Sequence, residues 1–574
     1  MCQTAAMLST VANPAADRSA QAFPILKPPQ VETALRFASG AAQRFGAGEA
    51  IYGIGDRDVP AWLVLEGAID ITRRDGPEHE VALTTHGSRQ FTGEISQLSG
   101  APSLAAGHAG VHGALAVPFD AAHLRALMVG SADVGEVIMR GLILRRVGLI
   151  AAAGSGSVLV GDPGNAALRR IEQFLTRSGY PVQVLDAAGE GEGHALVERL
   201  GVLPAELPLM LCPNGTVLKD PTEVEVAACL GITPEIDPDR LYDAAIIGAG
   251  PAGLAAAVYA ASEGLSVIVL DGQSMGGQAG ASSRIENYLG FPTGISGGAL
   301  TGRAFTQALK FGAEIAIPVK VERLDRDGDV PGAPSTLHLA GDRRVRARTI
   351  VIASGARYRR PLIHNLAEFE GAGVSYWASP IEAKLCAGEE VALVGGGNSA
   401  GQAVAFLAPQ VAKLHLIVRR PLEETMSRYL VERIAALPNV VLHVGKEIVA
   451  LEGDDQGLAA AVFRDRITDE DHRCAMRHLF LFIGAEPNAE WARGCLDMDD
   501  KGFVTTGAEF AGDAVACGRT ALPLETSRPS VFAIGDVRAG STKRVAAAVG
   551  EGAAAVAQIH LALAHHQADG GAHG

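Results

Sequence analysis

The chain has 574 residues, which is too long for one hydrophobic core and predicts about three or four domains. Its 64 acidic and 49 basic side chains give a net charge of −15, which disfavours binding to phosphate backbones. No stretch approaches the roughly 18 apolar residues that cross a bilayer, and residues 1–20 lack the pattern of a signal peptide. We therefore expect a cytoplasmic protein with no nucleic-acid or membrane partner, and with a flexible leader at 1–25 and a flexible tail at 566–574.

Cysteine is scattered along the chain. The seven residues are Cys2, Cys212, Cys229, Cys386, Cys474, Cys495 and Cys517. No two of them form a Cys-x-x-Cys pair, which argues against a zinc ribbon, a disulfide framework and a local dithiol motif. We expect mostly buried or unreactive thiols and no metal site.

Residues 26–150 contain short apolar runs broken by glycine, followed by a helical stretch from about 121 to 149. Such runs predict a small β-barrel. With the segment 91–102, this region resembles a cyclic-nucleotide-binding domain, in which a glutamate (here Glu94) holds the ribose and an arginine pairs with the phosphate. Ser103 stands at the arginine position and carries no charge. A nucleotide effector, another ligand and a scaffold role therefore all stay open.

Residues 155–235 follow, after a glycine-serine linker at 154–157. Strands from 157, 182 and 209, with a helix at 166–178, resemble a thioredoxin or glutaredoxin fold in which Pro208 is the loop proline, cis in that family. Residues 161–164, Gly-Asp-Pro-Gly, stand where the Cys-x-x-Cys would follow the first strand. Without thiols there, we expect a docking or spacing module.

A glycine-rich turn marks the next region. A buried strand at 242–247 runs into the Gly-x-Gly-x-x-Gly sequence of residues 248–253, a helix follows, and the next strand ends at Asp271. The glycines let the backbone approach a pyrophosphate at the helix N-terminus, and Asp271 can accept from ribose hydroxyls. This pattern predicts a dinucleotide site.

Further motifs at 275–278, 285–288, 294–297, 351–356, 531–537 and 544–546 resemble the low-molecular-weight thioredoxin reductases over residues 240–563. The resemblance implies a homodimer that binds FAD in a discontinuous Rossmann-like domain, residues 240–365 and 484–565. The implied FAD residues are Gly248, Gly250, Pro251, Ala252, Gly253, Asp271, Gly277, Gln278, Asn287, Gly355, Gly535, Asp536, Arg544, Val545 and Ala546.

A second nucleotide site is predicted in an inserted Rossmann-like domain, residues 370–482. A strand at 390–394 leads into a Gly-x-Gly-x-x-Ala turn, and the following strand ends in two arginines rather than an acid. Arginines accommodate a 2′-phosphate, so NADPH is expected over NADH. The family pattern is His-Arg-Arg with a further arginine downstream, and here Val418 replaces the histidine. The implied NADPH residues are Gly395, Gly397, Asn398, Ser399, Ala400, Arg419 and Arg420.

The dithiol of thioredoxin reductases is missing. Their Tyr-Cys-Ala-Thr-Cys-Asp segment corresponds to residues 376–381, Tyr-Trp-Ala-Ser-Pro-Ile. Trp377 and Glu382 are our candidate catalytic residues, Trp377 as a cover for the flavin and Glu382 as a substitute proton donor. Packing of Trp377 between domains is an equal alternative.

The predicted architecture is multidomain: a β-barrel, a thioredoxin-like α/β domain and two Rossmann-like α/β domains. The predicted function is oxidation of NADPH by bound FAD, with electrons passed to a quinone, oxygen, an electron-transfer protein or a partner disulfide. One alternative is a redox or cyclic-nucleotide sensor that keeps both cofactors as structural ligands. Another is an atypical disulfide reductase that uses noncontiguous cysteines such as Cys212 and Cys229.

Overall fold

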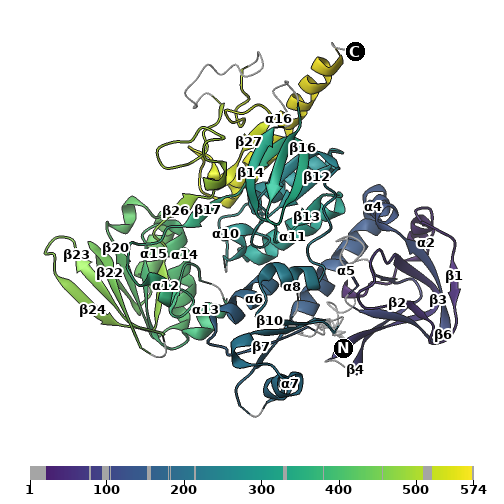
Figure 1. Cartoon of the computed structure of the whole chain (residues 1–574), viewed down its shortest axis with the longest axis horizontal. Helices are drawn as coiled ribbons and strands as arrows, with labels where there is room; N and C mark the ends of the chain where they lie inside the picture. The colour runs from purple at the N-terminus through teal and green to yellow at the C-terminus, as the bar shows by residue number, and fades with distance from the viewer. Residues whose placement is uncertain are drawn as a thin grey trace, which may run out of the picture. The chain divides into compact units, whose positions relative to one another are not determined.

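The structure is a computed structural model of the whole chain (Figure 1). It describes residues 21–571 except residues 76–78, 94–101, 104, 152–156, 179, 181, 190, 213–214, 283, 327–332, 379, 455–456 and 508–519. Residues 154–156 of the glycine-serine linker and Glu94 lie outside these described residues. By internal contacts the chain divides into two units. Unit 1 holds Met1–Gly161, Gly179–Pro234 and Leu309–Phe311, and unit 2 holds Asp162–Ser178, Glu235–Ala308 and Gly312–Gly574.

The first part of unit 1 is an antiparallel sheet of six strands. They are β1 (Gln43–Phe45), β2 (Ala50–Tyr52), β3 (Ala61–Asp75), β4 (His79–Gly87), β5 (Phe91–Thr92) and β6 (Ala106–Phe119). The order is β1-β6-β3-β4, with β2 on β6 and β5 on β3. Helices α2 (Pro28–Leu35), α4 (Ala121–Gly130) and α5 (Ala132–Ala151) accompany the sheet. The helical stretch predicted at 121–149 is thus confirmed, although it breaks at Ser131.

The second part of unit 1 is a four-stranded sheet with the order β10-β9-β7-β8. Its strands are β7 (Val158–Gly161), β8 (Gln183–Asp186), β9 (Leu209–Leu211) and β10 (Val217–Lys219), with helices α7 (Glu192–Leu200) and α8 (Glu223–Cys229). Strand β8 is parallel to β7, whereas β9 is antiparallel to β7 and to β10. The Leu207–Pro208 peptide is cis, as the resemblance implied.

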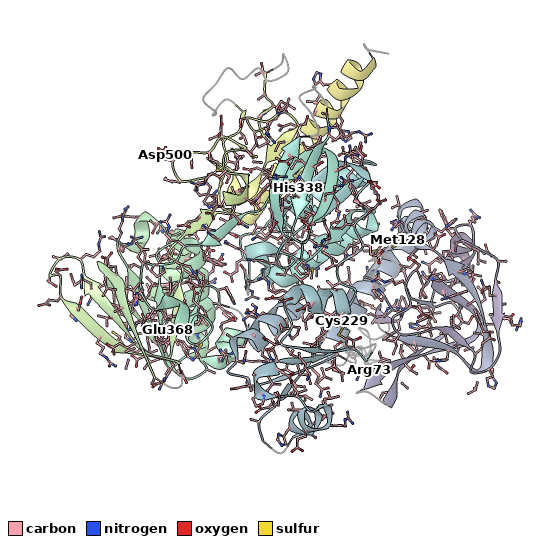
Figure 2. All side chains as sticks on the ribbon, in the orientation of Figure 1. Arg73, Met128, Cys229, His338, Glu368 and Asp500 are labelled. Atoms are coloured by element: carbon pink, nitrogen blue, oxygen red, sulfur yellow. A yellow bond between two sulfur atoms is a disulfide. The ribbon has the colours of Figure 1, made fainter. Side chains whose placement is uncertain are left out.

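A disulfide joins Cys212, directly after β9, to Cys229, the last residue of α8. Figure 2 marks Cys229 on this unit. The expectation of mostly unreactive thiols, with no disulfide, is wrong for this pair. Seventeen residues separate the two cysteines, so no local spacing rule identifies them, and the fold brings their Cα atoms to 6.6 Å. Cys2 and Cys517 lie outside the described residues.

Unit 2 contains a seven-stranded sheet with the order β13-β12-β11-β16-β15-β14 and β27 on β16. Its strands are β11 (Leu241–Ile247), β12 (Val267–Leu270), β13 (Glu314–Ala316), β14 (Val321–Arg326), β15 (Ser335–Leu339), β16 (Arg343–Ile352) and β27 (Val531–Ala533). Pairing of β27 with β16 is parallel and closes the sheet across almost 180 intervening residues, which is the predicted discontinuity. Its core is a cluster of buried, mainly aliphatic side chains around Ile247, Ile268 and Ile350.

A separate parallel sheet is inserted between β16 and β27. It has the order β18-β25-β19-β20-β21, formed by β18 (Val374–Ser375), β19 (Glu390–Val394), β20 (Lys413–Val418), β21 (Val440–Val444) and β25 (His478–Leu481). An antiparallel sheet of β22 (Lys446–Asp454), β23 (Gly457–Asp465) and β24 (Asp471–Ala475) precedes β25. The two connections to the insert pair as β17 (Ala356–Tyr358) and β26 (Ala485–Pro487).

The last helix, α16 (Val545–Gly571), runs beside β16 and β27 in Figure 1. Its first 21 residues are long and apolar enough to cross a membrane by length and composition, contrary to the sequence expectation. This helix packs on α9 (Pro251–Ser262), where a Cβ on Gly552 would lie 2.5 Å from the Ala252 carbonyl oxygen. It is helical as far as Gly571, whereas the sequence predicted a flexible tail from residue 566.

Candidate functional site

The turn between β11 and α9 leaves room for a ligand at one glycine only. Gly248 has φ of +114°, and a Cβ there would lie 2.2 Å from the Ala353 carbonyl oxygen. A Cβ on Gly253 would lie 1.9 Å from the Gly248 oxygen. At Gly250 a Cβ would meet only the Gly277 Cα, at 3.9 Å. Protein packing therefore requires the first and third glycines, whereas the second faces open space.

Helix α9 begins at this turn. Pro251 is its first residue and Ala252 is buried. The first N–H groups of the helix have no partner within it, which makes its N-terminus a site for phosphate. The Asp271 carboxylate accepts hydrogen bonds from the backbone N–H groups of Ala249 at 2.8 Å, Gln273 at 2.8 Å and Ser274 at 3.2 Å. Burial raises the pKa of Asp271, and these three hydrogen bonds counteract the rise.

The second predicted FAD motif lies against the first. A Cβ on Gly535, whose φ is +71°, would lie 2.9 Å from the Ala252 Cβ. Burial raises the pKa of Asp536, while Lys543 nearby acts to lower it. The Asp536 carboxylate accepts no hydrogen bond from the described residues. A half-buried carboxylate without a donor is suited to accept from the hydroxyl groups of a ligand.

A half-buried ion pair holds this turn on α16. The Glu551 carboxylate accepts from the Gly535 N–H at 2.6 Å and pairs with Arg538, Nη2 to Oε1 at 2.7 Å. At the start of the helix, Arg544 is exposed, Val545 is half-buried and Ala546 is exposed. The predicted residues 544–546 therefore form the N-terminal end of α16.

Three loops complete the surroundings of Gly250. A Cβ on Gly277 would lie 3.1 Å from the Gly250 Cα, and the Gln278 side chain donates to the Ala356 carbonyl. Gly355 has φ of +67° and no atom within 4 Å of an added Cβ. Asn287 is exposed and makes no hydrogen bond within the described chain. The structure thus brings the Gly277 loop and the Gly535 turn to the Gly248–Gly253 turn, whereas no hydrogen bond among the described residues ties Asn287 to the other predicted FAD residues.

Two residues that the sequence did not indicate also lie here. Arg177, from helix α6 (Ala166–Arg177), donates from Nη2 to the Gly277 carbonyl at 2.8 Å. Burial lowers the pKa of Arg177, and the nearby Asp271 and Tyr358 counteract the decrease. Burial raises the pKa of Tyr358 to about 12, and Arg177 and Asp536 lie close enough to modify it. No sequence signal identifies either residue, because α6 is more than 60 residues before the glycine turn.

These features fit FAD. The open Gly250 turn and the N-terminus of α9 suit a pyrophosphate, the Arg177 guanidinium adds positive charge, and Asp536 offers a half-buried acceptor to hydroxyl groups.

The inserted sheet carries a second turn of the same kind. Gly395 has φ of +147°, and a Cβ there would lie 2.3 Å from the Phe482 carbonyl oxygen. Gly397 is the N-cap of α14 (Asn398–Leu407), with no atom within 4 Å of an added Cβ. As in the first turn, one glycine is fixed by packing and another faces open space.

The start of α14 is held by its neighbours. The Asn398 side chain accepts from the Ser427 N–H at 2.6 Å, and Thr425 donates to the Gly396 carbonyl at 2.7 Å. Ser399 is exposed and Ala400 is buried. The exposed hydroxyl of Ser399 is therefore available to a phosphate at this helix N-terminus.

Arg419 and Arg420 follow β20, the strand next to the glycine turn. Both are exposed, and neither forms a hydrogen bond or ion pair with the described residues. Free guanidinium groups at the end of this strand suit the 2′-phosphate of NADPH.

Aromatic and acidic side chains occupy the segment of the missing dithiol. The Trp377 Nε1 donates to Glu382 Oε1 at 2.9 Å, and Glu382 is buried. The Trp377 ring lies 6.4 Å from the Tyr358 ring, and Tyr358 stacks on Tyr376 at 6.0 Å. The charge of Asp536 acts on the pKa of Tyr358, and the Tyr358 ring contacts Trp377. Tyr358 therefore connects the two candidate catalytic residues with the surroundings of Asp536. Ser379 lies outside the described residues.

In the six-stranded sheet of unit 1, Ser103 stands where the resemblance implied an arginine for the cyclic phosphate. The Ser103 hydroxyl donates to the Ala105 carbonyl at 2.7 Å, and the Ser103 backbone pairs with Gly55 and Asp56. This hydroxyl is committed to the loop and supplies no charge for a cyclic phosphate.

The family described as pyridine nucleotide-disulphide oxidoreductase matches residues 242–552, more than half of the chain. The chain belongs to this family. It is a flavoprotein oxidoreductase of the thioredoxin reductase type that uses FAD and NADPH. The seven-stranded sheet and the inserted parallel sheet of unit 2 therefore belong to Rossmann-like nucleotide-binding domains.

The relatives match the same half of the chain. Thioredoxin reductase from Mycolicibacterium smegmatis is 32% identical over 315 residues, which cover 55% of this chain and 94% of that protein. The F component of alkyl hydroperoxide reductase from Pseudomonas putida is 32% identical over 325 residues, 56% of this chain and 58% of that protein. The chain thus spans little more than half the length of the latter relative. A crystal structure of T. acidophilum thioredoxin reductase is 27% identical and covers 56% of this chain and 98% of that one, with a TM-score of 0.50.

Arg177→Met is expected to weaken FAD binding about 10- to 100-fold, because a hydrogen bond to a charged group contributes about 1.5–3 kcal/mol. Flavin retention during gel filtration and titration of apoprotein with FAD measure the effect. Arg170→Met, at an exposed position of the same helix, is the control. Equal FAD affinity in the two variants would show that Arg177 only joins α6 to the Gly277 loop.

Proposed function

We propose that this protein oxidises NADPH through bound FAD and passes the electrons to an acceptor outside the flavin site. The acceptor classes are a quinone, oxygen, a small electron-transfer protein or a disulfide of a partner protein. The relatives named for thioredoxin and alkyl hydroperoxide reduction favour a disulfide partner. The related reductases also favour a homodimer.

The observation that carries the proposal is the Trp377–Glu382 pair. In thioredoxin reductases a disulfide at this segment takes electrons from the flavin, whereas here an indole donates to a buried carboxylate at 2.9 Å. The nearest thiol of the segment, Cys386, is buried, and burial raises its pKa to about 11. A buried neutral thiol without a partner cannot relay two electrons as a dithiol does.

The chain's own residues supply binding, orientation and exclusion of water. Arg419 and Arg420 hold the 2′-phosphate of NADPH, the α14 N-terminus holds its pyrophosphate, and the Gly250 turn holds that of FAD. When bound, FAD accepts a hydride from NADPH and releases electrons singly or in pairs. Trp377 and Tyr358 limit access of water, and Glu382 orients the indole.

The proposal is tested by anaerobic reduction with NADPH, followed by mixing with oxygen, a soluble quinone, or a disulfide-containing protein. At least one acceptor is expected to restore the oxidised flavin spectrum over repeated cycles. Reoxidation by none of them, with FAD stably bound, would favour the sensor alternative.

Trp377→Ala is expected to leave the rate of flavin reduction by NADPH unchanged and to increase the rate of reoxidation by oxygen. The expected increase is about two- to tenfold, which is the rate ratio that corresponds to the free energy of one aromatic contact. Single-turnover stopped-flow absorbance measures both rates. Trp377→Phe keeps a ring over the site and removes only the bond to Glu382, so it should behave like the wild type. Unchanged reoxidation in the alanine variant would mean that Trp377 is a packing residue.

One observation favours a second candidate, in which the acceptor is internal. Cys212 and Cys229 form a disulfide, the pair named by the atypical disulfide-reductase hypothesis. In this version the Cys212–Cys229 disulfide would take two electrons and two protons from reduced FAD and become a dithiol. The barrel and the four-stranded sheet would then act as a cyclic-nucleotide-binding-like regulatory domain and a thioredoxin-like carrier.

A further inference from the structure

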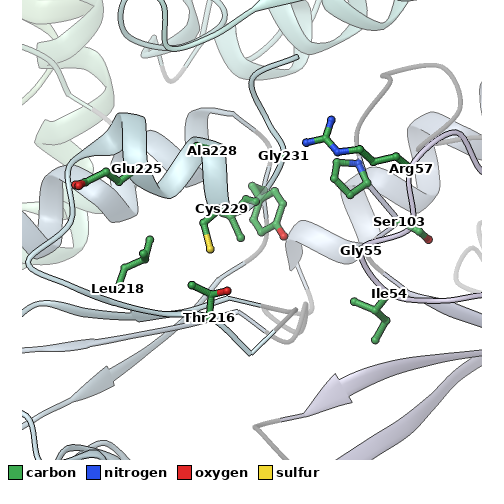
Figure 3. A pocket seen from close by; sticks show the side chains of 13 residues that line it. Ile54, Gly55, Arg57, Ser103, Thr216, Leu218, Glu225, Ala228, Cys229 and Gly231 are labelled. Atoms are coloured by element: carbon green, nitrogen blue, oxygen red, sulfur yellow. The ribbon is translucent and has the colours of Figure 1, made fainter. Parts of the chain in front are cut away.

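A cavity of about 480 Å³ lies within unit 1, on the surface of α8 and β10 (Figure 3). Arg57 and Ser103 line one side of it, and Thr216 and Cys229 line the other. Close packing fixes the two sides together, because a Cβ on Gly231 would lie only 2.1 Å from the Pro102 Cδ. The cavity is therefore a feature of the packed fold rather than a gap between loosely joined segments.

Polar groups in and behind the wall lack partners. Tyr180 lines the cavity, is 7% exposed, and its hydroxyl makes no hydrogen bond of normal geometry. The buried Ser157 hydroxyl is likewise unsatisfied, although it lies close enough to oppose the rise that burial causes in the pKa of Tyr180. Buried hydroxyl groups without partners are costly, and a bound polar molecule would satisfy them.

The charge of the wall favours an anion. The Arg57 guanidinium is exposed and forms no hydrogen bond or ion pair with the described residues. The acid in the wall, Glu225, is occupied by the N-cap of α8, where its carboxylate accepts from the Thr222 N–H and hydroxyl, both at 2.8 Å. Glu225 keeps its negative charge, but its carboxylate is already engaged, so Arg57 is the charged group of the lining that is left for a ligand to pair with.

The disulfide presents one sulfur to this cavity. Cys229 is half-buried and lines the wall, with its sulfur directed toward Thr216 in Figure 3. Cys212 is 2% exposed. Since a thiolate must reach the sulfur that it attacks, Cys229 is the accessible end of the bond and Cys212 the leaving group.

We propose that this cavity binds a small anionic thiol that exchanges with the Cys212–Cys229 disulfide. The thiolate of the ligand attacks the Cys229 Sγ, a ligand–Cys229 disulfide forms, and Cys212 leaves as a thiolate. A second thiol of the same class attacks the ligand sulfur, which releases Cys229 and the oxidised ligand dimer. Two thiols are oxidised and one disulfide is reduced, so the step balances without flavin, and the inference stands apart from the proposed function.

The experiment uses the full-length wild-type protein without NADPH. It is incubated with 2-mercaptoethanesulfonate, an anionic thiol, or with cysteamine, a cationic thiol, at matched thiolate concentration. Alkylation and peptide mass mapping then give the reduced fraction of the Cys212–Cys229 bond over time. The anionic thiol is expected to react about fivefold faster at low salt, which is the rate ratio that corresponds to the free energy of one exposed ion pair. The Arg57→Gln variant should abolish this difference in rate. Equal rates in the wild type would overturn the proposal.

A second measurement identifies the attacked sulfur. The Cys212→Ser variant is treated with the disulfide form of 2-mercaptoethanesulfonate, and Cys474, a half-buried thiol of unit 2, serves as the internal reference. The mixed disulfide is expected on Cys229 at least about fivefold faster than on Cys474. Preferential labelling of Cys474 would show that the cavity does not recruit the anion, and that result too would overturn the proposal.

Discussion

Gly250→Val is expected to yield a folded protein that retains less than about one-tenth of the wild-type FAD, because the side chain fills the space of the pyrophosphate. A Cβ at Gly250 meets no protein atom closer than 3.9 Å, and the φ of −77° suits any residue. Loss of cofactor should therefore occur without a clash inside the chain. The measurements are flavin absorbance per chain after purification and circular dichroism of the same sample.

Gly302→Val is the matched control. Gly302, in α11 (Gly297–Lys310), has no atom within 4 Å of an added Cβ and belongs to none of the predicted FAD motifs. It should retain FAD at the wild-type level. Full flavin occupancy in Gly250→Val, or equal loss in both variants, would contradict the assignment of the pyrophosphate to this turn.

The double variant Arg419→Ala, Arg420→Ala is expected to raise the KM for NADPH about 10- to 100-fold and the KM for NADH less than about threefold. The double variant removes hydrogen bonds to the 2′-phosphate of NADPH that contribute about 1.5–3 kcal/mol. NADH has no 2′-phosphate, so its binding does not depend on these hydrogen bonds. Both guanidinium groups are exposed and without partners among the described residues, so their removal leaves no unsatisfied group there. Steady-state rates with each cofactor measure the effect.

Arg428→Ala is the control, since Arg428 is exposed in the same domain and pairs with Glu432 at 2.8 Å. It should leave both KM values unchanged. An equal increase in the KM for NADPH and NADH in the double variant would show that the two arginines stabilise the domain rather than select the cofactor.

The nucleotide sites of unit 2 could be predicted because their chemistry is local. Gly248 and Gly395 have positive φ directly after a strand, a conformation that favours glycine. The glycine pattern that follows from this conformation lies within a few consecutive residues and can be recognised in the sequence. Val531–Ala533 returns to β16 from far along the chain, yet its Gly-Asp motif identified it.

The remaining features depend on tertiary contacts. Arg177 reaches the FAD site from a segment without any motif, and Tyr358 lies just beyond the motif at 351–356 but is not part of it. The Cys212–Cys229 bond joins the end of a strand to the end of a helix, and its spacing belongs to no short pattern. The length of α16 was missed because glycine and alanine, rather than large apolar residues, make up most of its first 20 positions.

The electron count of anaerobic reduction tests the central claim most directly. A flavin without a dithiol partner takes up two electrons, so titration with NADPH should bleach the flavin completely at about one NADPH per FAD. The Cys212→Ala, Cys229→Ala variant should give the same end point. An end point near two NADPH per FAD in the wild type, falling to one in the variant, would contradict an external acceptor and place the Cys212–Cys229 disulfide on the electron path.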